Sequence, residues 1–155
     1  MIKSIEGNFD HPEVNELLTK HFIELRAASP EGSAHVLDIP GLKVSSIKFW
    51  SLWESEKLMG CGALKFLEKG HGEFKSIRVN DKFRNKGYGI KIINHLIEEA
   101  KKLDIKRLSI ETGAGQFFEP ARKLFDKCRF EPCKPFAHYK DDKNSIYLTK
   151  LISNE

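Results

Sequence analysis

The sequence has 155 residues, of which 40% are hydrophobic and 31% charged, and its formal net charge is +4. This length and apolar content predict one globular domain, residues 1–155, with a buried core. A membrane protein is disfavoured, because no run approaches the roughly 18 apolar residues of a span and the first ten residues lack a signal-peptide core. We therefore expect a soluble, cytoplasmic protein that does not act at a membrane.

The cysteines and histidines predict neither a disulfide framework nor a metal centre. Cys61, Cys128 and Cys133 are an odd number of thiols without a Cys-x-x-Cys pair, which is typical of reduced core residues. The six histidines show no spacing of metal ligands. No metal site is expected.

The first third of the chain predicts a strand, a helix and an irregular loop. Weak alternation favours a strand over residues 1–5, and Asp10 is suited to cap the helix that follows. The apolar stripe of this helix recurs at helical spacing. It consists of Val14, Leu17, Leu18, Phe22 and Leu25. Pro30 disfavours helix at Ser29, and residues 29–44 are expected to be irregular.

Three antiparallel strands are predicted next. Residues 46–54 and 58–67 are rich in aromatic and aliphatic residues and flank a polar turn, which is typical of a hairpin. Gly60 and Gly62 inside the second strand indicate close packing or a bulge. In the third strand, residues 73–79, regular alternation predicts that the odd-numbered residues share one face. These are Glu73, Lys75, Ile77 and Val79.

A basic turn containing two glycines follows the third strand. Arg84-Asn85-Lys86-Gly87-Tyr88-Gly89 leads directly into an amphipathic helix. Both glycines are expected to allow positive φ and a close backbone approach, and the unpaired N–H groups of the helix N-terminus form a positive dipole end. From Arg78 to Lys91, five basic residues face one acid. The turn therefore predicts an anion site, most simply for a phosphate.

The remaining elements complete an α/β order. The helix after the turn is expected to bury Ile90, Ile93, Ile97 and Ala100. Residues 106–112 predict a strand parallel to 73–79, because a whole helix intervenes. A helix that starts near Pro120 and strands over 133–139 and 145–152 follow. The expected fold class is α/β, with a mixed, mostly antiparallel sheet flanked by helices.

Two common phosphate-binding motifs do not match the turn. A P-loop requires Gly-Lys-Ser/Thr after its glycines, whereas Gly89 is followed by Ile90 and Lys91. A dinucleotide fingerprint requires a third glycine where Ile92 stands, and a strand early in a βαβ unit.

The turn and its surroundings resemble instead the GNAT superfamily of N-acetyltransferases. The cofactor motif of that family is Arg/Gln-x-x-Gly-x-Gly/Ala after a hydrophobic strand, and the chain has Arg84-x-x-Gly87-x-Gly89 after Ile77–Val79. Residues 59–64 and 121–130 are similar to two further family motifs. Runs such as Glu111-Thr-Gly resemble an uncharacterised bacterial subgroup.

The resemblance implies an enzyme with acetyl-CoA as cosubstrate, which moves the acetyl group to an amine by direct attack in a ternary complex. Amides of the turn would hold the pyrophosphate, the preceding strand edge would pair with the pantetheine, and the helix from Ala121 would flank the thioester. The cofactor-binding residues implied are Ile77, Arg78, Val79, Arg84, Asn85, Lys86, Gly87, Tyr88, Gly89, Phe118, Ala121 and Phe125.

Such a transfer needs a general base, because an alkyl ammonium with a pKa near ~10 cannot attack a carbonyl. Glu73 matches the spacing of the base in some family members, and a solvated surface glutamate is the alternative. His71 is a second candidate. The tyrosine that protonates the thiolate in the family falls at Phe125, so Tyr139 is the candidate substitute, with core packing as the alternative. A thiol with a pKa near ~8.5 can also leave unaided.

Two further departures affect the thioester end, where Phe118 and Arg129 replace the family's usual asparagine and glycine.

The expected acceptor is a small-molecule amine, with residues 29–44 and their acid Asp38 closing the pocket. A peptide or protein amine, or a non-catalytic acyl-CoA-binding module, is the alternative. Nucleic acid is a disfavoured partner, because the positive charge gathers at the turn and does not follow a face. Whether the chain forms a homodimer stays open.

Overall fold

The chain folds around a seven-stranded sheet in a computed structural model that describes residues 1–152. The strands are β1 (Lys3–Glu6), β2 (Ile47–Glu54), β3 (Lys57–Glu68), β4 (His71–Val79), β5 (Arg107–Gly113), β6 (Glu131–Pro132) and β7 (Ser145–Leu151). Their spatial order is β1-β2-β3-β4-β5-β7-β6. Only β4 and β5 run parallel; the other neighbours are antiparallel. The predicted mixed, mostly antiparallel sheet is confirmed.

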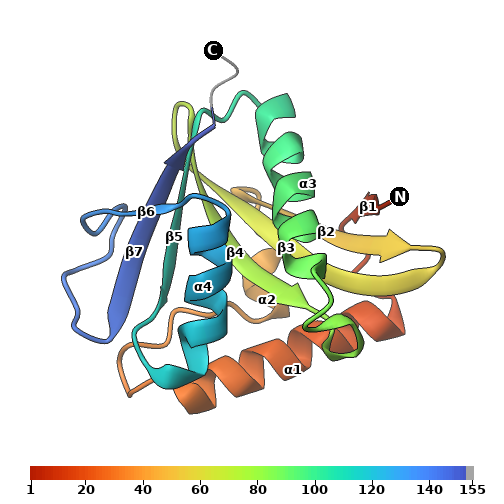
Figure 1. Ribbon diagram of the computed structural model, residues 1–155, viewed down its shortest axis with the longest axis horizontal. Helices are drawn as coiled ribbons and strands as arrows, with labels where there is room; N and C mark the ends of the chain where they lie inside the picture. Colours follow the sequence, from red (N-terminus) through yellow and green to blue (C-terminus); the bar gives the residue numbers. More distant parts are fainter. Residues whose placement is uncertain (153–155) are drawn as a thin grey trace.

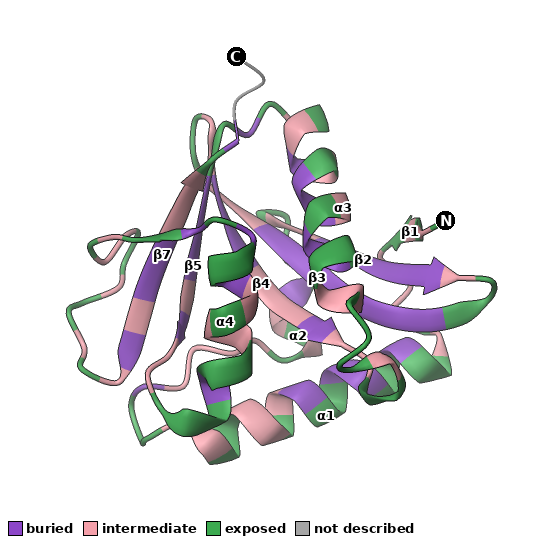
Figure 2. Ribbon diagram, viewed as in Figure 1, coloured by how far each residue is buried: buried purple, intermediate pink, exposed green. Residues whose placement is uncertain are grey.

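Helices cover both faces of this sheet (Figure 1). They are α1 (Pro12–Ala28), the short α2 (Ile39–Leu42), α3 (Tyr88–Lys102) and α4 (Glu119–Lys127), with single 3₁₀ turns at Asp81–Phe83 and Gln116–Phe118. One core cluster joins α3 and α4 to the sheet, and a second joins α1 and α2 to its other face. The sheet-facing sides of α1 and α3 are buried, while their outer sides are exposed (Figure 2). None of the helices within the described residues is long and apolar enough to cross a membrane.

The first helix begins one residue later than its predicted cap implied. His11 is the N-cap, and its Nδ1 accepts a hydrogen bond of 3.2 Å from the N–H of Glu13. Asp10 therefore lies outside the cap, because Pro12 takes the first helical position, where its missing N–H costs nothing. The predicted end at Ser29 is confirmed.

The β2–β3 hairpin is confirmed, and its two glycines allow close packing. A Cβ atom on Gly60 would lie 2.2 Å from the backbone oxygen of Arg78, and one on Gly62 would lie 2.3 Å from Leu96 Cδ1. These positions thus permit the approach of β4 on one side and of α3 on the other.

The buried face of α3 is rotated from the predicted one. Ile90 is 38% exposed, whereas Ile92 is fully buried. Ile90 lies in the first turn of the helix and lines a cavity, so it does not pack on the sheet. The predicted burial of Ile93, Ile97 and Ala100 is confirmed.

A β-bulge in β4 overturns the predicted alternation of that strand. Lys75 pairs with Ala63 and Arg78 with Cys61, so one residue of β3 faces both Ser76 and Ile77. Ser76 has a φ of 54°. The extra residue reverses the faces beyond it. Ile77 and Val79 pack on the α3 side with Phe74, whereas Glu73 and Arg78 point to the other face.

The two parallel strands separate soon after they meet. Their register consists of His71 with Arg107, Gly72 with Leu108 and Glu73 with Ser109. Beyond these pairs β4 and β5 diverge toward their carboxyl ends (Figure 1). The edge of β4 from Ser76 to Val79 therefore has no neighbouring strand on the β5 side among residues 1–152.

The C-terminal region differs from prediction in one strand. Residues 145–151 form β7 as expected, but 133–139 form no strand, and β6 covers only Glu131 and Pro132. Pro135 offers no N–H to a ladder, and Ala137 has a φ of 54°. This segment instead packs the Phe136 and Tyr139 rings against each other.

Candidate functional site

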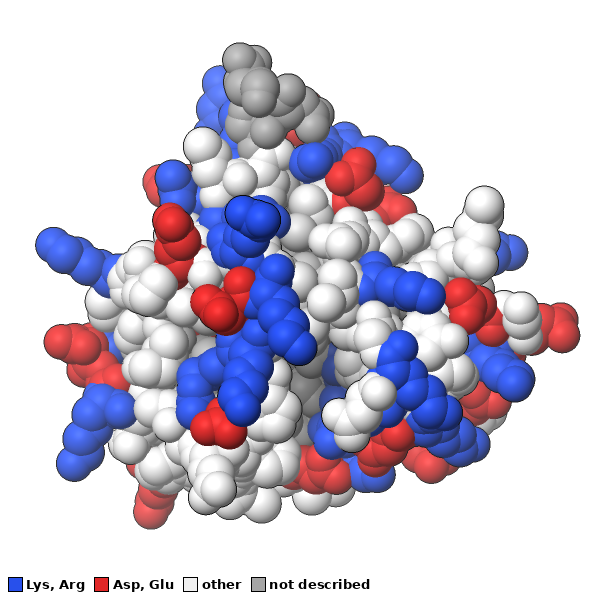
Figure 3. Space-filling view, viewed as in Figure 1, with Lys and Arg blue, Asp and Glu red and all other residues white. Residues whose placement is uncertain are grey.

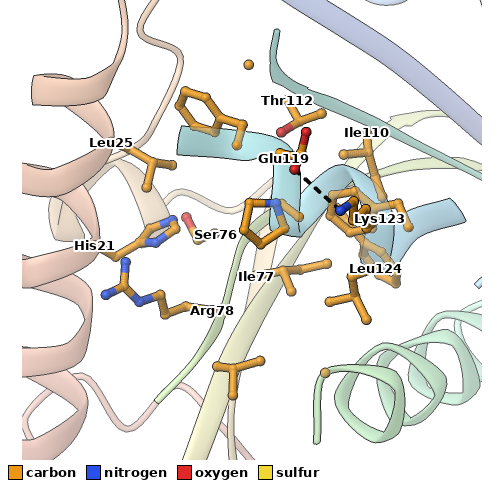
Figure 4. Close-up of a pocket in the computed structure, with 18 of the residues that line it drawn as sticks. His21, Leu25, Ser76, Ile77, Arg78, Ile110, Thr112, Glu119, Lys123 and Leu124 are labelled. Atoms are coloured by element: carbon orange, nitrogen blue, oxygen red, sulfur yellow. Dashed lines mark ion pairs between the residues drawn. The ribbon is translucent and has the colours of Figure 1, made fainter. Parts of the chain in front are cut away.

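A cavity of about 560 Å³ occupies the opening between β4 and β5. Its lining comes from α1, the loop after it, β4, the turn before α3, β5 and α4. Figure 4 shows His21 and Leu25 on one side and Ile110, Thr112 and Leu124 on the other. Because the lining includes Ile77 from the α3 side and Glu73 from the α1 side, the cavity passes through the sheet.

The turn before α3 contains a glycine with positive φ, as predicted, but the second glycine serves another purpose. Gly87 is the N-cap of α3 with a φ of 82°, and Asn85 has a φ of 61°. Gly89 does not have positive φ; a Cβ atom there would lie 2.8 Å from Leu124 Cδ2. Gly89 therefore lets α4 approach α3, and the left-handed conformation belongs to Gly87 and Asn85.

Positive side chains surround the mouth of the cavity. In Figure 3, Lys and Arg gather over α4 and over the turn before α3, on either side of a hollow. Arg84 Nε lies 3.0 Å from Asp81 Oδ1, and Lys123 lies 3.4 Å from Glu119. A hydrogen bond from Lys20 is the main reason why the pKa of Asp81 is lowered. Asp81 is thus an anion that holds the basic turn against α1.

Glu73, Lys75 and Tyr139 form a hydrogen-bonded cluster at the inner end of the cavity. The Tyr139 hydroxyl donates to Glu73 Oε2 at 2.6 Å, and Lys75 Nζ donates to Tyr139 at 3.0 Å and to Glu73 at 3.4 Å. Glu73 is 2% exposed. Burial, followed by the charge of Glu73, raises the pKa of Tyr139. The two predicted catalytic side chains thus touch, but only Glu73 lines the cavity.

The second candidate base lies elsewhere. His71 Nε2 is 2.7 Å from Ser109 Oγ, and the ring does not line the cavity. Its place at the start of β4 puts it where β4 and β5 are still paired. Nothing in this geometry brings His71 to a substrate.

A family model decides which protein family this architecture represents. The model described as the acetyltransferase (GNAT) family matches residues 12–130, which include the turn, the split strands and α4. The chain belongs to the GNAT family.

Curated relatives carry the same family activity in their names. A Bacillus subtilis protein named as an uncharacterised N-acetyltransferase, YsnE, is 44% identical over 140 residues, covering 90% of this chain and 93% of its own. An Escherichia coli protein named in the same way, YedL, is 38% identical over 142 residues, covering 92% and 89%. This GNAT protein is accordingly an N-acetyltransferase.

A solved structure supports the fold assignment. An acetyltransferase of Bacillus subtilis in complex with CoA aligns with a TM-score of 0.71 at 19% identity, covering 97% of this chain and 99% of that one. At that identity the likeness concerns the fold. It confirms the predicted GNAT architecture.

Most GNAT cofactor positions predicted from the motif lie around the cavity. The lining residues among them are Ile77, Arg78, Val79, Arg84, Asn85, Gly87, Tyr88, Gly89, Phe118, Ala121 and Phe125. Lys86 is not part of the lining. The Arg78 guanidinium turns away toward α1, where it lies 2.8 Å from Glu24 Oε1, because the bulge places Arg78 on that face.

The positions that depart from the GNAT pattern have visible packing roles. A Cβ atom on Gly113 would lie 2.1 Å from Phe118 Cδ2, so the Phe118 ring fits against the glycine backbone. Phe125 packs edge-on against Phe130 at 5.8 Å between ring centres. Arg129 has a φ of 68°, a conformation for which glycine is the usual residue.

The α1 side of this GNAT cavity contains polar residues that the sequence did not single out as site residues. Glu111 is half-buried on β5, accepts a hydrogen bond of 2.8 Å from Ser145, and has its pKa raised mainly by burial. His21 is buried, and burial beside Arg78 lowers its pKa to about 3. The Glu111-Thr-Gly run, which resembles an uncharacterised bacterial subgroup, is the sequence signal that could have indicated Glu111.

The loop after α1 closes this side of the cavity, as predicted. Ser33 and His35 are part of the lining. Asp38, the predicted acid of the loop, is not; its carboxylate accepts the N–H of Gly41 and caps α2. Within residues 1–152, no group of three or more His, Cys, Asp or Glu side chains is arranged to hold a metal ion.

Proposed function

We propose that this GNAT chain transfers the acetyl group of acetyl-CoA to the amine of a small molecule by direct attack in a ternary complex. The observation that carries the proposal is the cavity that passes through the sheet between β4 and β5. Because the cavity reaches both faces of the sheet, the thioester and the amine can meet from opposite sides, and no covalent enzyme intermediate is needed.

The α3 side of the cavity fits the cosubstrate. Backbone N–H groups of Arg84–Gly89, at the positive end of α3, would hold the pyrophosphate. The unpaired edge of β4 at Ile77–Val79 would pair with the pantetheine amides. Phe118, Ala121 and Phe125 would flank the acyl end. Bound there, acetyl-CoA supplies the activated acetyl group.

Glu73 is proposed as the general base. Its carboxylate is buried at the inner end of the cavity, and Oε2 is held by Tyr139 and Lys75. Because the bulge puts Glu73 on the face opposite Ile77, its carboxylate lies on the acceptor side. Tyr139, which does not line the cavity, is proposed to act through Glu73 by fixing its position.

A small acceptor fits the closed α1 side. The loop residues Ser29, Ser33 and His35 line the cavity together with His21 of α1. A wall on this side favours a compact amine over an extended peptide as the proposed acceptor. Figure 4 shows His21 and Leu25 facing the opening from α1.

The test is a thiol-release assay with acetyl-CoA against a panel of small amines, amino acids and peptides. Glu73→Gln should lower kcat/KM by ~10² to 10⁴ at neutral pH, and the loss should shrink as pH rises and free amine becomes abundant. Glu98→Gln, an exposed change on α3, serves as the control. A wild-type pH profile for Glu73→Gln would show that Glu73 is not the general base. Faster turnover of peptides than of small amines would refute the proposed class of acceptor.

A further inference from the structure

Two carboxylates face the acceptor side of the cavity from neighbouring strands. Glu73 pairs in register with Ser109, and Glu111 follows two residues later on β5, so both carboxylates point to the same face. Both residues line the cavity. Glu111 stands just past the last β4–β5 pair, where the strands begin to separate.

The two carboxylates differ in how they are held. Glu73 Oε2 accepts hydrogen bonds from Tyr139 and from the cationic Lys75. Glu111 accepts one bond, from the neutral Ser145 hydroxyl. Among residues 1–152, no cation lies within ion-pair distance of Glu111. Glu111 is therefore the carboxylate with capacity for a cationic ligand.

The surroundings of Glu111 make it a stronger base than an exposed glutamate. The titratable groups that face it are Lys75 and Glu73 on β4, His35 in the loop after α1, Tyr139, and Tyr147 opposite it on β7. Burial is the largest influence and raises the pKa of Glu111. A raised pKa of Glu111 brings it closer to the pKa of an alkyl ammonium, which is near ~10, and so makes proton transfer from the ammonium to Glu111 less unfavourable.

The chemistry of the proposed reaction requires two proton transfers. An amine enters as an ammonium ion and leaves as an amide, so its nitrogen loses two protons. One ends on the sulfur of the released thiol, and the other goes to solvent. A single carboxylate would have to lose the first proton before it could accept the second, whereas two carboxylates in one cavity can each accept one proton.

We propose that Glu111 binds the ammonium group of the acceptor and takes its first proton, and that Glu73 takes the second. This assignment rests on the proposed amine acetyltransferase function. The first transfer leaves a free amine and a neutral Glu111. The nitrogen lone pair then attacks the thioester carbonyl, the C–N bond forms, and the C–S bond breaks with its electron pair on sulfur. The second N–H proton passes to Glu73 as the amide forms. One of the two carboxyl protons then goes to the thiolate and the other to solvent, which returns both carboxylates to their charged state.

The test compares two acceptors that differ in basicity. One is the best alkyl amine from the panel, and the other is its fluorinated analogue, whose amine is largely unprotonated at the assay pH. Glu111→Gln should lower kcat/KM at least tenfold for the alkyl amine and less than about threefold for the analogue, within the range of a proton-transfer contribution. Glu73→Gln should lower kcat/KM for both, and Glu98→Gln for neither.

A second variant keeps the test valid if Glu111→Gln does not fold. The Ser145 hydroxyl lowers the pKa of Glu111, so Ser145→Ala should move the acid limb of the kcat/KM profile to higher pH. A purely structural role would not move that limb.

Three results would overturn the assignment. Equal losses for both amines would show that Glu111 does not act on the ammonium proton, and unchanged rates would remove Glu111 from the reaction. Wild-type protein that releases no thiol with any amine would instead overturn the proposed function, and with it this inference.

Discussion

His21 shows how one buried side chain can link stability to pH. The ring is 5% exposed, and its Nδ1 has no hydrogen-bond partner within the described residues. Burial, Arg78 and Arg84 lower the pKa from 6.5 to about 3. The folded state therefore holds a neutral imidazole over a range in which the unfolded chain binds a proton.

The consequence is acid destabilisation between pH 6.5 and about 3. In that window the unfolded state binds more protons, so stability should fall as pH falls, by up to ~1.4 kcal/mol per pH unit from this residue. His21→Leu should remove that slope in urea unfolding measured from pH 4 to 8. The exposed His138→Leu should leave it unchanged; equal slopes for wild type and His21→Leu would contradict the argument.

At the scale of elements, the C-terminal end of α4 carries backbone strain. Arg129 follows the helix with a φ of 68°, where a side chain costs ~1 kcal/mol relative to glycine. Arg129→Gly should stabilise the fold by up to about that amount, reduced by the added flexibility of the unfolded chain. Lys123→Gly, in the middle of α4, should destabilise by ~1 kcal/mol. Urea unfolding of both variants measures the contrast, and a loss of stability in Arg129→Gly would refute the strain.

The contact between α3 and α4 is predicted to control cosubstrate affinity. A Cβ atom at Gly89 would meet Leu124, so Gly89→Val should push α4 from α3 and disturb the turn beside it. CoA binding measured by calorimetry should weaken at least tenfold, about 1.4 kcal/mol. Adding Leu124→Ala makes room for the valine and should restore part of the affinity. Unchanged affinity in folded Gly89→Val would exclude the turn as the CoA site.

For the whole molecule, acetyl-CoA should stabilise the fold by binding only the folded state. At a hundred times Kd the gain is about 2.7 kcal/mol, which for a chain of this size raises Tm by roughly 5–10 °C. S-acetyl-pantetheine, which lacks the pyrophosphate, should give a smaller shift at the same concentration. Equal shifts of Tm from both ligands would show that the basic turn does not contribute to binding.

The predictable parts of the structure were those with local signals. The turn from Arg84 to Gly89, the helix after it and the β2–β3 hairpin follow from glycines, charge and periodicity, and all are present. The bulge at Ser76 was missed because it arises from pairing with β3, and nothing in the local sequence marks it. The bulge also explains why Glu73 is not on the face predicted for it.

The site was predicted in part for the same reason. Residues of the turn and of β4 were found from a contiguous motif, and Glu73 and Tyr139, 66 positions apart, do meet. Glu111 was not proposed as a site residue, because its proximity to Glu73 depends on the register of two strands separated by a helix. A strand is predicted over 133–139, but the structure has a loop there, in which the Phe136 and Tyr139 rings pack against each other.

The separation of β4 and β5 has a mechanical consequence. The sheet consists of two halves that are in register over three residue pairs at one end, His71–Glu73 with Arg107–Ser109. Bending of one half against the other should therefore concentrate at these three pairs, as in a plate cut from one edge. A ligand that bonds to the free edge of β4 while it packs against α4 would bridge the two halves and make the whole sheet stiffer.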